Sequence, residues 1–307
     1  MAGGSIRMIV DRWCLCALLV TLLSPMACAA DGGGFLFGKA ANKTPNSYAQ
    51  RQQVIAGLPL ERLTRHAQNR ILSIANSPTL YRRLPTQAID CDRDMFLFLA
   101  RNPEVLVGIW DLMGITHVQT KRTGPYQLEA QDGSGTDCQV DLVYGDPNIH
   151  IFIAEGSYDG KLVARPIRGK GVFILRSTYA TGADGRTTVT GTLDSFVQIE
   201  SLGADLVART LSGLIGRSAD NNFTETARFI SQVSQASELN PPAMIDVAHR
   251  LPQVTEPTKV QFIIAINTVA NRPDRINRPD RIRHPDRIRH TEQQYQSAKK
   301  LRSTQSR

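Results

Sequence analysis

The spacing of apolar residues changes twice along the chain, and these changes divide it into three parts. Apolar residues first recur at every third or fourth position, which is typical of helices that are buried on one side. Between about residues 115 and 200 they alternate with polar residues, which is typical of half-buried strands. A helical period then returns as far as Val233. The pattern predicts an α+β protein in which helices flank a run of strands.

The first helical stretch begins at Pro59 and follows a lead-in rich in Gly, Ala and Asn that we expect to be flexible. Its apolar stripe consists of Leu60, Leu63, Ala67, Ile71 and Ile74. Such a stripe either docks on a neighbouring core or lies on a membrane surface, and we expect it to dock. Residues 30–83 are therefore predicted to be a lead-in with one amphipathic helix, outside the core domain.

Two short helices are predicted directly after a first strand at Thr86–Cys91. Asp92 is a suitable N-cap for the first helix, which is strongly apolar. The second begins at Asn102-Pro103-Glu104, because Pro is favoured at the first helical position and an acidic residue in the first turn. Gly114 is expected to end it.

Six further strands follow, separated by short Gly-, Asp- and Pro-containing turns. Short connections favour antiparallel neighbours, so these strands are predicted to form a meander. The predicted strands are Ile115–Arg122, Tyr126–Gln131, Thr136–Tyr144, Ile149–Tyr158, Arg165–Ala180 and Thr187–Glu200.

A long helix is predicted after the last strand. Its apolar stripe runs from Leu202 to Val233, with an interruption near Gly216 and a capping box formed by Asn222 and Glu225. A bent meander needs a cover for its concave face, and this stripe is the natural candidate. We therefore expect a curved antiparallel sheet of about seven strands with the long helix on its concave face, within a core domain at 84–255.

The N-terminus matches the pattern of an export signal. Two arginines precede an apolar run of about eleven residues, and Ala27-Cys28-Ala29 fits a cleavage site. We predict that residues 1–29 are a cleaved signal peptide and that the protein is periplasmic or secreted. An uncleaved anchor, a false start codon and lipid attachment at Cys28 stay open as alternatives.

The C-terminus carries a six-residue repeat, NRPDRI, that starts at Asn271. Because Pro recurs in every copy, the repeat is unsuited to a helix interior or a central strand. Residues 256–307 are predicted to be a disordered basic tail, in which the apolar run Val260–Ala270 is either an added strand or part of the extension. The repeat either contacts anionic envelope components or has no role.

Composition and charge exclude several classes of protein. Apolar residues make up 41% of the 307 residues, which excludes a wholly disordered chain. The formal net charge is +8, but residues 31–270 hold 23 basic and 23 acidic residues, so the excess lies at the termini. The charge therefore gives no support for specific nucleic-acid binding.

Cysteine and histidine spacing indicates no resident cofactor or metal. Cys91 and Cys138 remain after signal cleavage, and they are either bridged or two separate buried thiols. No HExxH, CxxC, GxSxG, GxxxxGK or GxGxxG motif is present, so we expect neither a dedicated metal site nor a nucleotide cofactor.

Five residues stand out as candidates for ligand binding: Glu155, Arg176, His117, Trp110 and Phe173. Glu155 shares strand parity with three isoleucines. It is therefore either a buried acid, base or ligand-orienting group with Arg176 as its partner, or turned outward near Gly156. His117 and His150 are potential acid–base groups or ordinary surface histidines. The aromatic residues Trp110 and Phe173 either line a ligand pocket or fill the core.

The order of strand, two helices, six strands and long helix over residues 84–240, together with the segment Phe96–Ile115, resembles the helix-grip superfamily. This superfamily includes START lipid-transfer domains, polyketide cyclases and Bet v 1-like carriers. The resemblance also extends to uncharacterised secreted bacterial proteins. It implies a cavity between the sheet and the long helix that holds an apolar small molecule or lipid. A structural envelope protein with a solid core and, less favoured, a cyclase- or hydrolase-like enzyme are the alternatives.

Overall fold

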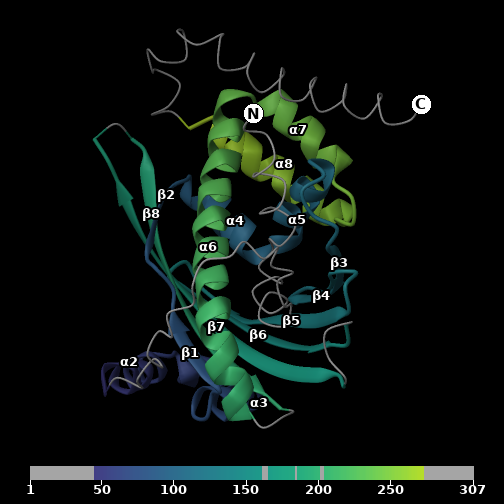
Figure 1. Ribbon diagram of the computed structural model, residues 1–307. Helices are drawn as coiled ribbons and strands as arrows, with labels where there is room; N and C mark the ends of the chain where they lie inside the picture. The colour runs from purple at the N-terminus through teal and green to yellow at the C-terminus, as the bar shows by residue number, and fades with distance from the viewer. Residues whose placement is uncertain (1–44, 161–164, 184, 201–203, 273–307) are drawn as a thin grey trace, which may run out of the picture.

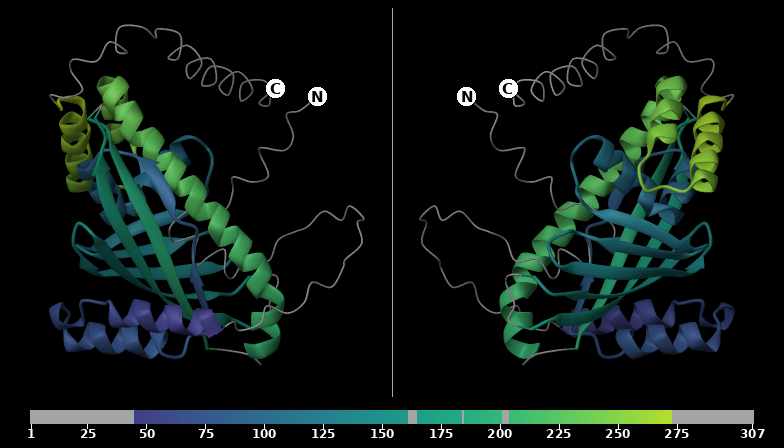
Figure 2. Two further views of the ribbon diagram at one scale, coloured as in Figure 1. Left: turned by 90° about the vertical axis from the view of Figure 1, so that its left-hand side faces the viewer. Right: turned by 90° about the vertical axis from the view of Figure 1, so that its right-hand side faces the viewer.

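The computed structural model describes residues 45–160, 165–183, 185–200 and 204–272, with side chains from residue 48 in the first helix and from residue 219 in the longest one. At its centre lies a curved antiparallel sheet of eight strands, with helices on both faces (Figures 1 and 2). The predicted α+β class is confirmed. The predicted signal peptide and most of the repeat tail lie outside the described residues.

The strands follow the order β1-β8-β7-β6-β5-β4-β3, and β2 also pairs with β8. The meander from β3 to β8 is confirmed, and the first two strands join it through the last one. The strands are β1 (Leu80–Arg83), β2 (Gln87–Asp90), β3 (Gln119–Gly124), β4 (Gln127–Gln131), β5 (Thr136–Gly145), β6 (Ile149–Tyr158), β7 (Ile167–Thr181) and β8 (Thr187–Ile199). Strand β1 was not predicted, because its four residues, LYRR, carry no alternation of their own.

The two short helices after β2 form as their sequences predict. They are α4 (Arg93–Arg101) and α5 (Pro103–Leu112). The side chain of Asp92 accepts hydrogen bonds from the backbone N–H groups of Asp94 and Met95, so it caps α4. Gly114 adopts a φ of 68° just after α5, a conformation that glycine reaches without strain.

The long helix α6 (Ala204–Leu239) is continuous over 36 residues, so the predicted interruption near Gly216 is wrong. A single glycine lowers helix stability by only about 1 kcal/mol. Burial of Phe223, Ile230 and Val233 on the sheet side offsets that penalty. Asn222 is 5% exposed and lies inside the helix, so the predicted capping box is wrong as well.

Two further helices follow, α7 (Pro241–Arg250) and α8 (Glu256–Ala270). The prediction that the tail begins at residue 256 is therefore wrong, and Val260–Ala270 is a helix and not a strand. Phe262, Ile266 and Val269 are fully buried against the rest of the core. The core therefore extends to residue 270.

The convex side of the sheet, called here the outer face, is covered by the N-terminal helices. These are α2 (Pro45–Ala56), a short 3₁₀ turn η1 (Leu60–Arg62) and α3 (Arg65–Ala75). The predicted apolar stripe docks on this face, with Ile71 and Ile74 almost fully buried. Of the two alternatives for this helix, docking on a neighbouring core is therefore confirmed.

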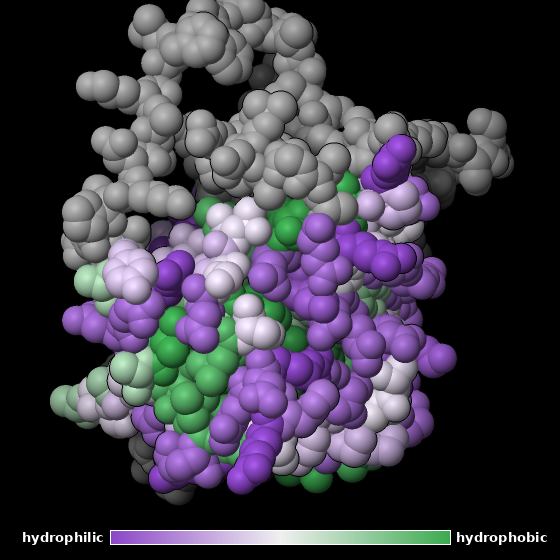
Figure 3. Space-filling model, turned by 90° about the horizontal axis from the view of Figure 1, so that it is seen from below, coloured by the Kyte–Doolittle hydropathy of each residue, from purple (hydrophilic) through white to green (hydrophobic). Residues whose placement is uncertain are grey.

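Seen from below, the side on which α2 and α3 lie, the surface is mostly polar with a strip of hydrophobic side chains through it (Figure 3). Within the described ranges, no helix combines the length and the apolar character needed to span a bilayer. Two separate apolar clusters remain inside, one on each face of the sheet.

Candidate functional site

Strands β6 and β7 are buried on both faces, and alternate residues belong to different clusters. Ile151, Ile153 and Ile174 lie on the outer face beneath α3. Phe152 and Phe173, which are paired directly across the two strands, lie on the concave side, called here the inner face. Helices α4, α5 and α6 contact this side of the sheet, and α7 and α8 pack against these helices (Figure 2).

The inner face is not completely closed. Val140 and Leu142 on β5 and Ile199 on β8 point inward with Phe152 and Phe173, yet they remain partly exposed. Apolar side chains that face inward but reach solvent are available to contact an apolar molecule. We call Val140, Leu142, Phe152, Phe173 and Ile199 the inner apolar face.

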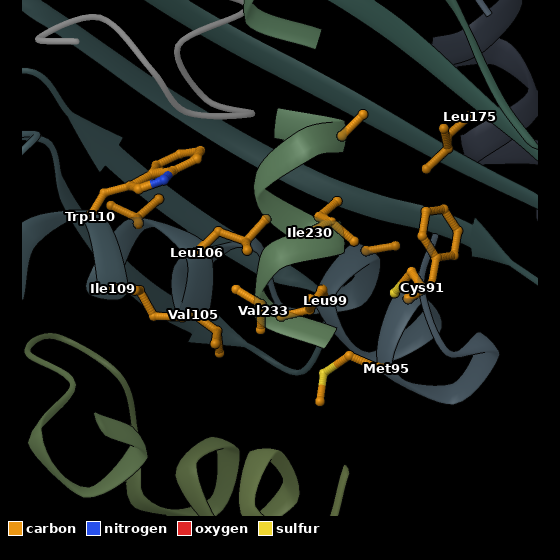
Figure 4. Packing of buried hydrophobic residues seen from close by; sticks show 14 of the residues in the cluster. Cys91, Met95, Leu99, Val105, Leu106, Ile109, Trp110, Leu175, Ile230 and Val233 are labelled. Carbon is orange, nitrogen blue, oxygen red and sulfur yellow. The ribbon is translucent and has the colours of Figure 1, made fainter. Parts of the chain in front are cut away.

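Trp110 and Phe173, two of the five predicted residues, both lie in the inner cluster. Trp110 on α5 packs against Phe229 on α6, with ring centroids 5.3 Å apart. Figure 4 shows Trp110 on α5 together with Leu106 and Ile109 of the same cluster. Phe173 is 6% exposed and faces Phe152 across the strands. The structure therefore brings these two aromatic residues to the same side of the sheet.

The predicted cavity between the sheet and the long helix depends on the lower part of α6, residues 204–218. This part of the helix crosses in front of the sheet in Figure 1. Its side chains lie outside the described residues, so the cavity stays a prediction. The partly exposed side chains of the inner apolar face are its described boundary.

Glu155 lies on the outer face and does not enter the inner cluster. One of its carboxylate oxygens lies 3.1 Å from Arg70 Nη2 on α3, and its side chain is 43% exposed. Arg70 also donates to Asp141 at 2.7 Å, so it bridges two strands of the sheet. The predicted pairing of Glu155 with Arg176 is wrong, because cross-strand register places Lys170 opposite Glu155 and Ile149 opposite Arg176.

Arg176 also lies on the outer face, at the opposite end of β7 from Lys170. Its Nη2 lies 3.4 Å from the carbonyl oxygens of both Val54 and Gly57, at the C-terminal end of α2. A cation at this position is favoured by the helix dipole. Arg176 therefore connects α2 to the sheet and borders a cleft on that face.

His117 is exposed in the segment between α5 and β3. The three polar residues that were expected to share one cavity, Glu155, Arg176 and His117, are thus not brought together. The structure gives no support for an enzyme that uses these three residues at a single site.

His150 is the inward-facing polar residue that the prediction did not select. It is fully buried and accepts a hydrogen bond on Nε2 from Arg101 Nε at 3.2 Å. Burial, and then the nearby guanidinium of Arg101, lower the pKa of His150 to about 4. The imidazole is therefore neutral at pH 7. Successive side chains of a strand point to opposite faces, and His150 and Glu155 are an odd number of positions apart in β6. This spacing already indicated that the two residues face opposite sides of the sheet.

Cys91 and Cys138 were expected to be either bridged or two separate buried thiols. Both are buried and they form no disulfide with each other. Within the described ranges, no three His, Cys, Asp or Glu side chains gather as the ligands of a metal ion would.

No family model and no curated protein matches this chain. Solved structures with a similar arrangement include an uncharacterized protein from Rhizobium leguminosarum (12% identity, 47% of this chain and 94% of that chain, TM-score 0.29). A second is Ara h 8.0201, with 12% identity over 46% of this chain and 97% of that chain and a TM-score of 0.26. A third is the di-domain ARO/CYC BexL from the BE-7585A biosynthetic pathway, with 14% identity over 69% of this chain and 62% of that chain and a TM-score of 0.24.

The likeness to these structures is loose, and it does not show that this chain belongs to the helix-grip superfamily. TM-scores of 0.3 or less support no statement about function. The fold assignment rests on the order of strands and helices in this chain itself.

Proposed function

We propose that the protein binds an apolar small molecule or lipid on the inner face of the sheet, beneath the lower part of α6. The observation that carries this proposal is the partial exposure of Val140, Leu142 and Ile199, which point inward from two strands. On the outer face, by comparison, the central strands bury Ile151 and Ile174 fully, although Val143 near the end of β5 is partly exposed. Apolar ligand sites are lined mainly by side chains of this kind.

Trp110 offers a direct optical test, because Trp13 is the only other tryptophan of the chain. In a Trp13→Phe chain, all tryptophan fluorescence comes from the inner cluster. We expect 9,10-dibromostearic acid to quench it saturably, since bromine quenches tryptophan at short range. Unbrominated stearic acid should compete and restore the signal.

A matched pair of variants on β5 locates the site. Leu142→Lys places a charge on the inner apolar face and should weaken quenching about tenfold or more, because an unpaired charge there opposes contact with an apolar chain. Gln139→Lys places the same charge on the exposed outer side of the same strand and should change nothing. Absence of saturable quenching in the parent chain would overturn the proposal.

We further propose that the protein is exported and that binding takes place outside the cytoplasm. The supporting observation is the order of basic segment, short apolar run and Ala27-Cys28-Ala29. Expression of the full chain in a bacterial host, followed by intact mass measurement of the exported fraction, tests this directly. A mature protein that begins near Ala30 is expected, and a full-length cytoplasmic product would contradict it.

A second candidate function is that of a structural protein whose basic repeat contacts anionic envelope components. The observation in its favour is the charge of residues 271–307, which hold eleven basic and four acidic residues. A chain that ends at residue 272 should then lose retention on isolated envelopes. Unchanged retention would remove this candidate.

A further inference from the structure

A cleft of about 520 Å³ opens on the outer face, well away from the inner apolar face. It lies where the end of α2 and the η1 turn meet the β5–β6 turn and the C-terminal half of β7. Its volume falls in the range of sites that hold small molecules, roughly 300–1,000 Å³. The two sides of the sheet therefore present separate surfaces for binding.

Arg176 is one of the charged residues that line this cleft. Its contacts among the described residues are the two carbonyl oxygens at the end of α2, both at 3.4 Å, and no carboxylate lies within ion-pair distance of it there. These contacts involve only Nη2. The remaining N–H groups of the guanidinium are left to donate to a ligand, and a guanidinium fits two oxygens of a carboxylate or phosphate at once.

The guanidinium of Arg62 also lines the cleft. Arg62 on η1 donates to the hydroxyl of Tyr144 at 3.3 Å, and its side chain is 66% exposed. Its nearest acidic neighbour, Glu61, is 3.9 Å away and 76% exposed, which is a weak surface pair. Arg62 can therefore turn toward a bound anion at little energetic expense.

The carboxylate of Asp146, which also lines the cleft, is already committed to the protein. Its Oδ1 accepts hydrogen bonds from the N–H groups of Asn148 and Ile149, and its Oδ2 accepts one from the Tyr144 hydroxyl. Although burial opposes the charged form, these hydrogen bonds lower the pKa of Asp146. Of the two acidic residues in the lining, Asp146 is used in the turn and Glu61 is 76% exposed, whereas the two arginines keep N–H groups that can donate to a ligand.

Part of the cleft is apolar, and the remaining lining includes the polar residues Asn148, Ser177 and Thr178. Leu58 and Ile149 form part of its lining, at 6% and 7% exposure, and Ala56 and Pro59 lie beside them. A ligand that fits both parts carries an anionic group at one end and a small apolar body at the other.

We propose that this cleft is a second binding site, for a small organic molecule with a phosphate or carboxylate group, and that Arg176 is its main anion-binding residue. Arg62 supplies the second cation, and the apolar lining contacts the body of the ligand. The site is independent of apolar-ligand binding on the inner face, because it lies on the other side of the sheet.

Titration calorimetry of the full chain with phenyl phosphate, benzoate and benzyl alcohol tests the proposal. The two anions distinguish phosphate from carboxylate as the preferred group, and the alcohol measures the apolar part alone. Saturable binding of at least one anion, with the alcohol at least about tenfold weaker, is expected. If neither anion binds saturably at millimolar concentrations, the proposal fails.

Three arginine variants locate the site. Arg176→Gln should weaken anion binding about tenfold or more, the effect of losing a charge-assisted hydrogen bond. Arg168→Gln is the matched control, since Arg168 is an exposed residue on the same face of the same strand, outside the cleft. It should bind like the parent.

Because Arg176 also holds α2, the melting temperature of Arg176→Gln must be measured beside its affinity. Arg62→Gln provides an independent check, as Arg62 is mostly exposed and its loss should leave folding intact while weakening binding several-fold. Parent-like anion affinity in the folded Arg62→Gln and Arg176→Gln chains would overturn the assignment. Quenching of Trp110 by dibromostearic acid should be unchanged in both.

Discussion

The two faces of the sheet are built from equally apolar residues but are covered in different ways. On the outer face, Ile151, Ile153 and Ile174 are fully buried beneath α3. On the inner face, Val140 and Leu142 stay partly exposed although helices lie on that side, whereas on the outer face the partly exposed side chains of β5 are Val143 and Tyr144, near the end of the strand. The completeness of the cover, and not hydrophobicity, separates a structural core from a surface available to a ligand.

Deletion of the helices that cover the outer face should lower the stability of the protein more than any other change. A chain that begins at residue 77 lacks α2 and α3 and exposes the outer cluster, each side chain of which contributes about 1.5–3 kcal/mol when buried. The total exceeds the usual stability of a domain, about 5–15 kcal/mol. We expect no cooperative thermal transition by circular dichroism, and a folded, soluble truncated chain would show that the outer face is not a core.

Single side-chain truncations should have the next largest effect, and they should lower the free energy of unfolding more on the outer face than on the inner face. Ile71→Ala removes a fully buried side chain from the outer cluster and should lower the free energy of unfolding by about 2–5 kcal/mol. Leu142→Ala removes a partly exposed one and should lower it by less than about 1.5 kcal/mol. Urea denaturation measures both, and equal losses would remove the distinction drawn between the faces.

A fall in pH should lower the free energy of unfolding because of His150, which is buried on the inner face. Its pKa is lowered to about 4 in the folded protein but is about 6.5 when unfolded, so below pH 6.5 the unfolded chain binds a proton that the folded chain does not. Stability is therefore complete above pH 6.5 and falls toward pH 4, by up to about 3 kcal/mol. The neighbouring charges are Arg101, which favours the neutral imidazole, and Asp146, which opposes that effect.

Urea denaturation at pH 7.0 and 4.5 measures this loss. His150→Gln should reduce the difference between the two pH values, whereas His117→Gln, a change at an exposed residue, should leave it as in the parent. A parent-like difference in the His150→Gln chain would show that the loss arises elsewhere.

The smallest effect is expected at Glu155. Its ion pair with Arg70 is partly exposed, so Glu155→Gln should lower the free energy of unfolding by less than about 1 kcal/mol. Asp141→Asn, at the less exposed partner of the same arginine, should lower it more. Neither change should alter quenching of Trp110, and a clear loss of quenching in Glu155→Gln would return that residue to the inner site.

Alternation along the chain was enough to predict the meander but not to say which side of it is inside. In β6, Ile149, Ile151 and Ile153 alternate with Phe152 and Ala154, so both faces read as apolar. Glu155 and Arg176 were correctly placed on one face with the isoleucines. That this face is the outer one depends on α3, which docks from a distant part of the sequence.

The ends of the core were harder to predict for related reasons. The run Val260–Ala270 is apolar and rich in β-branched residues, and periodicity alone does not distinguish a short buried helix from a strand. Its burial depends on contacts with the preceding helix α7 and with the more distant α4 and α6, which its own residues do not reveal. Strand β1 is likewise defined by pairing with β8 and not by its own residues.

The length of α6 gives the molecule an axis. Its 36 residues extend over about 54 Å; α2 and α3 lie toward its lower end, and α8 packs against its upper part (Figure 2). A single continuous helix therefore links the end of the body near the N-terminal helices with the end formed by α7 and α8.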